Sequence, residues 1–253
     1  MRILVLVVLG VFLFNIQGQT QIVNIEDKRY QKDTTGWFGL VDLSLSYVRN
    51  SGSVLSITGT GRVDYLRDRS SNLFLANYRI VRTSTDDLIN DGFVHYRYGR
   101  KLNRRWQWEV FGQMQYNERL ALTLRTLIGT GPRLAVLDKE KQKIYFGLLY
   151  MYEYDELSEG QRYFHDHRLS MSLALNLQLT SILSFASTSY YQPLLTDIAD
   201  SRLSSVNSVN LQITGHLSFR FNFNVTYDAR ISKETESVPS TIYNIMNGLR
   251  WTF

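Results

Sequence analysis

Between Phe219 and Ser232 the sequence alternates without interruption between apolar and polar side chains. The odd positions carry Phe219, Phe221, Phe223, Val225, Tyr227, Ala229 and Ile231, and every even position is polar or charged. A strand directs successive side chains to opposite faces, whereas a helix would scatter these residues around its circumference. The segment therefore predicts a strand with one apolar face and one polar face.

Segments with the same alternation fill the chain from residue 36 onward, and 168–180 is another clear example. Tyr and Phe, which favour strands, number 16 and 13, whereas Pro, which is excluded from strand interiors, occurs 3 times. We predict an all-β chain with strands at 37–49, 53–66, 72–83, 88–99, 105–118, 120–136, 142–156, 163–179, 181–193, 204–217, 219–232 and 241–253. An even number of strands is typical of bacterial single-chain barrels.

Alternation by itself also fits a soluble β-sandwich, whose strands have one dry and one wet face. Two further features favour a membrane. Most segments exceed the five or six residues of a usual globular strand and reach the roughly nine to eleven that cross a bilayer. Aromatic residues gather near segment ends, for example Trp37, Trp106 and Tyr190, where interfacial girdles lie. We predict a transmembrane antiparallel up-and-down β-barrel of about 12 strands at 36–253, with a soluble exported β-protein as the alternative.

The last residues keep the alternation up to Phe253. This ending resembles the carboxy-terminal signature by which the assembly machinery of the bacterial outer membrane recognises barrels. The expected partners are that machinery, outer-membrane lipids and lipopolysaccharide. The oligomeric state is left open.

The first residues predict a secretory signal. Arg2 is followed by an apolar run over 3–14, which is too short to cross a bilayer as a helix, and 16–18 is a plausible cleavage site. We predict a signal peptide at 1–18 and a charged, irregular segment at 19–35 that either caps the lumen or extends into the periplasm. Export and a scattered net charge of +5 argue against nucleic acid as a partner. With 0 Cys, the chain has no disulfide and no thiolate metal site.

The predicted turns differ in length between the two ends of the barrel. Those after the even-numbered strands, near Arg69, Leu102, Lys139, Thr180 and Ser218, should be short and periplasmic. The longest gaps, at about 156–162, 193–204 and 233–240, should form external loops.

Charged side chains and one amide, that of Gln113, occupy positions predicted to face inward. They are Asp42, Arg62, Asp64, Arg79, Glu109, Gln113, Arg125, Arg133, Glu153, Arg168, Arg220, Asp228, Arg230 and Arg250. In a narrow barrel such groups cross-link the interior into a rigid core, whereas in a wider one they line a water-filled path. Both a structural barrel and a small-solute or ion pore are consistent with this pattern.

Two residue pairs have a spacing found in barrel hydrolases. A barrel phospholipase needs a His and a Ser on the lipid-facing side near the outer leaflet, and His216 with Ser218 has the spacing but is predicted to point inward beside a periplasmic turn. A barrel protease needs acidic residues and a His–Asp pair above the lumen, for which 86–87 and 165–166 are the candidates. Neither pattern is specific, so no catalytic residue is predicted.

A metal site is the remaining chemical possibility. His165 and His167 share one strand face, and Glu153 or Asp155 on the neighbouring strand could complete a ligand set. Amphipathic rings at the headgroup boundary need no ligand, however. No metal and no cofactor are predicted.

Two stretches of the chain carry a family resemblance. They are 93–117, which begins Phe-Val-His-Tyr-Arg-Tyr-Gly, and 124–133, Leu-Arg-Thr-Leu-Ile-Gly-Thr-Gly-Pro-Arg. With the segments 23–29 and 34–37 they resemble a family of salt-induced outer-membrane proteins of unknown function. The resemblance implies a barrel in the outer membrane and no established activity. The expected function is structural, envelope-maintaining or that of a narrow pore, with a lipid- or peptide-cleaving barrel enzyme as the alternative.

Overall fold

The computed structural model describes residues 22, 35–85, 87–158, 162–230, 233 and 239–251. The predicted signal peptide at 1–18, Phe253 and all of the segment 19–35 except Ile22 and Thr35 lie outside the described residues. Within the described part, no helix has the length and apolar character needed to cross a membrane.

The described chain forms one sheet of 12 strands, each hydrogen bonded to its neighbours in sequence. All neighbouring strands run antiparallel, so the predicted all-β, up-and-down architecture is confirmed. The strands are β1 (Gly36–Arg49), β2 (Ser53–Leu66), β3 (Ser70–Thr83), β4 (Asp87–Lys101), β5 (Trp106–Asn117), β6 (Leu122–Lys139), β7 (Gln142–Leu157), β8 (Arg162–Gln178), β9 (Leu183–Pro193), β10 (Ser201–Gln212), β11 (Leu217–Asp228) and β12 (Thr241–Trp251). A short 3-10 turn, η2 (Glu118–Leu120), separates β5 from β6.

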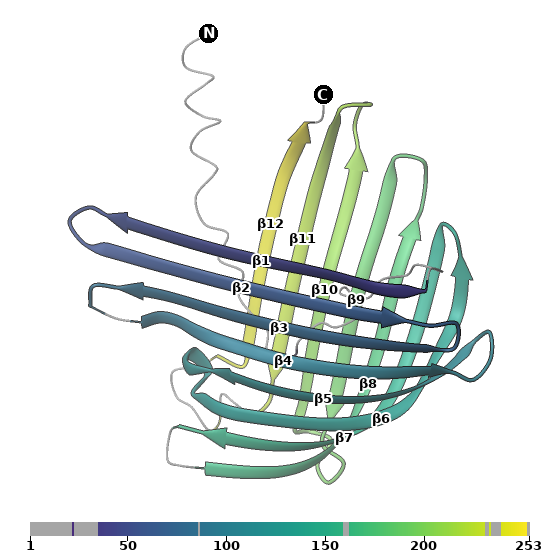
Figure 1. The fold of residues 1–253 in the computed structure, drawn as a ribbon, viewed down its shortest axis with the longest axis horizontal. Helices are drawn as coiled ribbons and strands as arrows, with labels where there is room; N and C mark the ends of the chain where they lie inside the picture. Colours follow the sequence, from purple (N-terminus) through teal and green to yellow (C-terminus); the bar gives the residue numbers. More distant parts are fainter. Residues whose placement is uncertain are drawn as a thin grey trace.

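The sheet curls strongly, as expected from the twist that neighbouring strands impose on each other. Figure 1 shows β1 to β4 passing in front of β9 to β12. Within the described chain β1 pairs with β2 and β12 pairs with β11, but β1 and β12 are not paired with each other. The architecture is therefore a barrel opened along the seam between its first and last strands.

The two ends of the barrel differ in their connections. The turns after β2, β4, β6, β8 and β10 have two to four residues, and they define what we call the short-turn end. The connections after the odd-numbered strands define the loop end, and the two longest of all, 194–200 and 229–240, lie there.

Three turns at the short-turn end share one side-chain arrangement. In each, the second turn residue accepts hydrogen bonds from the backbone N–H groups two and three residues later. Thr214 Oγ1, for example, accepts from His216 at 3.2 Å and from Leu217 at 3.0 Å. The other two turns use Asn103 and Thr180. These contacts satisfy backbone donors that the sheet leaves unpaired.

The turn at Thr214 corrects two predicted strands. The alternation suggested 204–217 and 219–232, with the turn near Ser218, whereas β10 ends at Gln212 and β11 begins at Leu217. The reason is that Ile213, Thr214 and His216 continue the apolar–polar alternation through the turn. Period-two patterning therefore could not mark where the strand ends.

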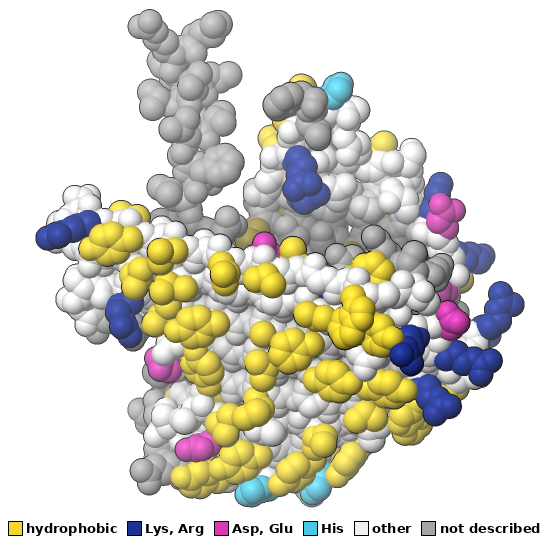
Figure 2. All heavy atoms as spheres, in the orientation of Figure 1, with side chains coloured by type: hydrophobic (Ala, Val, Ile, Leu, Met, Phe, Trp, Pro, Cys, Tyr) yellow, Lys and Arg dark blue, Asp and Glu magenta, His cyan; other side chains and the backbone are white. Residues whose placement is uncertain are grey.

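Side chains divide cleanly between the two faces of the sheet. Along each pair of strands the register places outward residues opposite one another, as in Leu211, Phe219 and Leu249 across β10, β11 and β12. Figure 2 shows hydrophobic side chains spread over the outer face, with Lys and Arg gathered toward one end of the view. Charged and hydroxyl groups occupy the inner face.

Candidate functional site

The loop-end half of the inner face holds a set of connected ion pairs, which we call the ion-pair network. Its members are Arg125, Glu153, Asp155, Asp166, Arg168, Asp200, Arg202, Asp228 and Arg230. They come from β6, β7, β8, β10, the loop that precedes β10, and β11 with the residues just after it. Seven of the nine are buried, and Asp200 and Arg230 are half-buried.

Arg202 on β10 is the centre of the network. Its guanidinium donates to Glu153 at 2.6 Å and to Asp155 at 3.0 Å, and both carboxylates belong to β7. On the other side it donates to Asp228 at 2.7 Å, on the neighbouring strand β11. Because β8 and β9 separate β7 from β10, the contacts with β7 cross the interior rather than following the wall.

Arg125 on β6 holds the other side of Asp155. Its Nε and Nη2 donate to the two carboxylate oxygens at 2.7 Å each, the bidentate geometry that a guanidinium favours. Asp155 is therefore shared between Arg125 and Arg202, which belong to strands four positions apart in the sheet.

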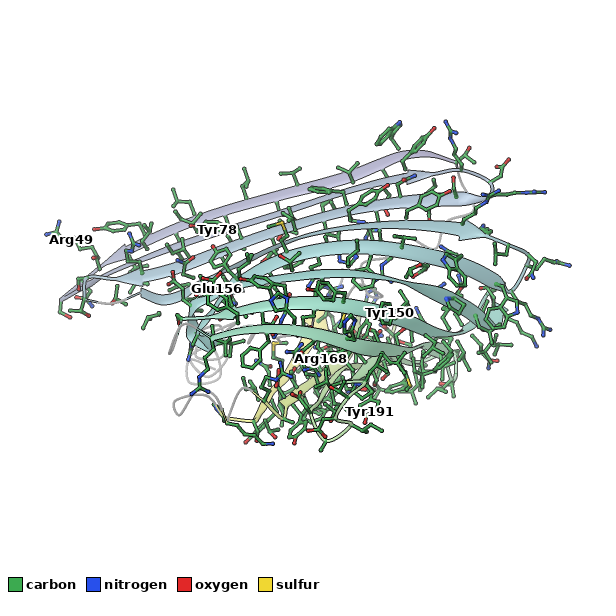
Figure 3. The ribbon with its side chains drawn as sticks, turned by 90° about the horizontal axis from the view of Figure 1, so that it is seen from below. Arg49, Tyr78, Tyr150, Glu156, Arg168 and Tyr191 are labelled. Atoms are coloured by element: carbon green, nitrogen blue, oxygen red, sulfur yellow. The ribbon has the colours of Figure 1, made fainter. Side chains whose placement is uncertain are left out.

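A second branch of the network joins β8 to the loop 194–200. Arg168 donates to Asp166 at 3.1 Å and to Asp200 at 2.8 Å, and also to the backbone carbonyls of Gln192 and Asp200. Arg230 donates to the same two carboxylates and lies over the ring of Phe164. Figure 3 places Arg168 within the body of the molecule, far from Arg49 at the tip of β1.

The pKa of Asp200 reflects this environment. Burial acts to raise it, but the hydrogen bonds and positive charges of Arg168 and Arg230 outweigh that effect and lower the pKa below its ordinary value. Asp200 is therefore held as a carboxylate, which keeps its loop attached to the two arginines.

The middle of the inner face carries a second polar cluster. Arg97 donates to Glu109 at 2.8 Å and to His95 at 3.3 Å. His95 in turn pairs with Gln113 at 2.9 Å, and Arg97 lies over the ring of Phe111. This cluster links β4 to β5, and all of its members are buried.

Little space is left between the ion-pair network and the His95 cluster. The cavity there measures about 30 Å³ and is lined by groups that include Ile22, Met151 and Tyr190. That volume is on the order of one water molecule. At this level the interior is filled by side chains.

The predicted inward residues fall into three groups by burial. Asp64, Glu109, Gln113, Arg125, Glu153, Arg168 and Asp228 are buried. Arg62, Arg79, Arg133 and Arg230 are half-buried. Asp42, Arg220 and Arg250 are exposed, because β1 and β12 flank the open seam and β11 lies next to β12. Their role in lining a pore stays a prediction.

Several residues of these clusters were not among the predicted lining residues: His95, Arg97, Asp155, Asp166, Asp200 and Arg202. His95 and Arg97 alternate with Tyr96 and Tyr98, so the period-two pattern of β4 would have identified them. Arg202 was missed because the predicted strand began at 204, two residues after it. Asp200 belongs to a loop, where no alternation applies.

The hydrolase arrangements are not assembled in the described residues. Ser218 is buried on the inner face, whereas His216 is exposed in the turn before β11 and contacts the ring of Trp251, at the short-turn end. His165 points outward, where it pairs with the Tyr152 hydroxyl at 2.8 Å, but its neighbour Asp166 points inward. Asp86 lies outside the described residues.

The same alternation separates the proposed metal ligands. His165 and His167 bond to tyrosine hydroxyls on the outer face, whereas Glu153 and Asp155 belong to the buried network on the inner face. In the ranges that the structure covers, no group of three or more His, Cys, Asp or Glu side chains could hold a metal ion.

Comparisons with known proteins identify a family. A family model described as a protein of unknown function, DUF481, matches residues 41–243. No curated protein matches the chain. One similar solved structure is described as a NanC porin in a rhombohedral crystal form; at 13% identity it covers 84% of this chain and 100% of its own, with a TM-score of 0.44. The fold assignment above rests on strand pairing and not on this likeness.

Proposed function

Since the chain belongs to the DUF481 family, whose function is unknown, we propose its role from its geometry. It is an outer-membrane β-barrel whose lumen is closed to ions at rest. Its role in this proposal is structural or envelope-maintaining. Contacts with lipopolysaccharide, recognition of Phe253 by the barrel-assembly machinery and induction by salt belong to the same proposal.

The outer face supports a membrane location. Leu43 is 84% exposed, Leu249 69% and Ile128 58%, and they are part of an apolar surface that extends over the sheet. Monomeric soluble proteins rarely expose apolar patches of more than a few hundred Å². Hydrocarbon would cover this surface, and aromatic residues such as Trp37 and Trp108 near strand ends fit the interfacial girdles of outer-membrane barrels.

The turns support an orientation. Outer-membrane barrels have short periplasmic turns and longer external loops. The short-turn end would therefore face the periplasm, and the ion-pair network at the loop end would lie toward the outside.

The single observation that supports a closed lumen is the contact of Arg202 with Glu153 and Asp155 across the interior. A buried charge is tolerated only where it is paired and hydrogen bonded, and each arginine of the network has at least two acceptors. A network of this kind cross-links the wall and would close the lumen to ions.

Conductance in a planar bilayer tests this proposal. The refolded wild-type protein should show no stable steps. Arg202→Ala removes the centre of the network and leaves Glu153, Asp155 and Asp228 with fewer partners, so we expect steps with a preference for cations. Arg220→Ala, on the same face but outside the network, is the matched control and should stay silent. Stable steps from the wild-type protein would contradict closure.

A narrow pore is the second candidate. It is favoured by the inner face of β8 to β12 toward the short-turn end, where amides such as Asn176, Asn210 and Asn222 replace the charged pairs. Stable conductance steps from the wild-type protein whose size or ion selectivity changes in the Arg220→Ala variant would support a narrow pore. The hydrolase alternative gains no support from the positions of His216 and Ser218.

A further inference from the structure

The short-turn end contains a cavity that the closed lumen does not explain. Its volume is about 760 Å³, and it lies between the turns that follow β2, β4 and β6. Ligand sites of small molecules commonly measure about 300–1,000 Å³. The cavity is therefore large enough for a small solute, unlike the space of about 30 Å³ at the centre of the barrel.

The walls of this cavity are strongly cationic. Eight Lys or Arg side chains line it, against four carboxylates. Six of the cations make no ion pair within the described part of the chain: Arg67, Lys101, Arg104, Arg105, Lys139 and Lys143. Like charges gathered around a concave surface raise the local concentration of counter-ions.

The carboxylates of the cavity are partly occupied by other groups. Asp64 accepts a salt bridge from Arg62, and Asp138 accepts a hydrogen bond from the Tyr145 hydroxyl at 3.0 Å. The ring of Tyr145 lies under the guanidinium of Arg133, at 3.9 Å from its centroid, which orients that cation on the wall. Because the eight cations outnumber the four carboxylates of the lining, the cavity keeps a net positive charge.

Four of these cations come from two separate turns. Arg104 and Arg105 follow β4, and Lys139 and Lys143 flank the turn after β6. A ligand with a single anionic group would engage one turn, whereas a ligand with two or more would bridge both. Guanidinium groups bind carboxylate and phosphate in a bidentate manner, and lysines add point charges.

We propose that the cavity is a binding site for small soluble polyanions that carry two or more carboxylate or phosphate groups. With the orientation argued above the site opens to the periplasm, and this placement rests on the proposed function. The binding of polyanions does not rest on the proposed function, because the cavity is separated from the ion-pair network by the filled centre of the barrel.

Calorimetric titration of the refolded full-length protein in detergent tests the proposal, with citrate and pyrophosphate as probes. Both should bind, and the affinity should fall as NaCl is raised, because salt screens exposed charges. Glucose and spermidine, which are neutral and cationic, should not bind. Conductance plays no part in this readout, so polyanion binding and lumen closure can fail independently.

Arg104→Glu with Arg105→Glu is the decisive variant. Each lost charge-assisted hydrogen bond is worth about tenfold in affinity, so the Kd of citrate should rise at least about tenfold. The matched control is Arg69→Glu with Arg100→Glu, which reverses two exposed charges at the same end but outside the cavity. We expect a change within about twofold there, from screened long-range charge alone.

Three results would overturn the proposal. One is the absence of citrate and pyrophosphate binding by the folded protein. Another is equal loss of affinity in the two double variants, which would assign the effect to overall charge. The third concerns lipid headgroups. The affinity for citrate should be the same in phosphatidylcholine and in phosphatidylglycerol nanodiscs. Loss of citrate binding in phosphatidylglycerol would show that the cations bind the membrane rather than a solute.

Discussion

Asp200 shows how one side chain attaches a long loop to the barrel. It accepts hydrogen bonds from Arg168 and Arg230, which belong to different parts of the wall. The loop has no strand pairing of its own between Leu194 and Asp200 apart from a single bridge to Arg168. Besides the backbone hydrogen bonds near Leu194 and Leu195, the side-chain contacts that hold the loop at the loop end therefore depend on the charge of one carboxylate.

This dependence gives the loop end a predictable response to pH. The pKa of Asp200 is lowered in the folded state, so its contribution to stability is present above the unfolded value of about 3.9 and is lost as pH falls through the lowered folded pKa. Asp200→Asn should therefore lower the free energy of unfolding at pH 7, and the difference from wild type should shrink below about pH 4. Urea unfolding in detergent micelles at several pH values measures this.

Asp68→Asn is the matched control for Asp200→Asn. Asp68 is an exposed carboxylate in the turn after β2, and this substitution should leave the free energy of unfolding unchanged. A pH-independent difference between wild type and Asp200→Asn would contradict the electrostatic explanation and point to packing instead.

At the level of elements, the alternation was enough to locate the strands. β2 begins and ends where the pattern predicted, and β8 differs from 163–179 by one residue at each end. The pattern was least informative at turns whose residues happen to alternate, as at Thr214. It also could not predict that Arg202 meets Glu153, because that contact depends on how tightly the sheet curls and not on the periodicity of either strand.

Substitution of Thr214 tests the hydrogen-bonding arrangement that three turns at the short-turn end share. Thr214→Val keeps the shape of the side chain but removes the acceptor of two backbone N–H groups, so we expect it to cost about 1–2 kcal/mol. Thr214→Asn should restore stability, because Asn103 performs the same role in the turn after β4. Urea unfolding of the three proteins in detergent measures this. Equal losses in both variants would show that the hydroxyl acts through something other than this acceptor.

At the level of the whole molecule, the open seam is the feature that a membrane would not tolerate. Unpaired backbone groups of β1 and β12 would lie in hydrocarbon, where each costs several kcal/mol. We therefore expect β1 and β12 to pair in the bilayer. The apolar outer face and the polar inner face already continue across both strands, so closure requires no change of face.

Cysteine cross-linking tests closure of the seam without background, because the chain has 0 Cys. Ser44→Cys in β1 is combined in turn with Asn244→Cys, Met246→Cys and Gly248→Cys on the same face of β12. One of these pairs should form a disulfide in the bilayer, since a disulfide requires Cα atoms within about 7 Å. Ser44→Cys with Ser208→Cys, two strands farther along the sheet, is the negative control. Failure of all three pairs would mean that the seam stays open.

The ion-pair network also sets an order for assembly. Neighbouring strands pair through short connections, so each hairpin can form from local sequence alone. Arg202 and Glu153 are 49 positions apart, and Arg230 and Asp166 are 64, so these contacts form only after β7 to β11 have taken their places. A chain with one strand missing or slipped would therefore leave these arginines and carboxylates without their partners and exposed to water.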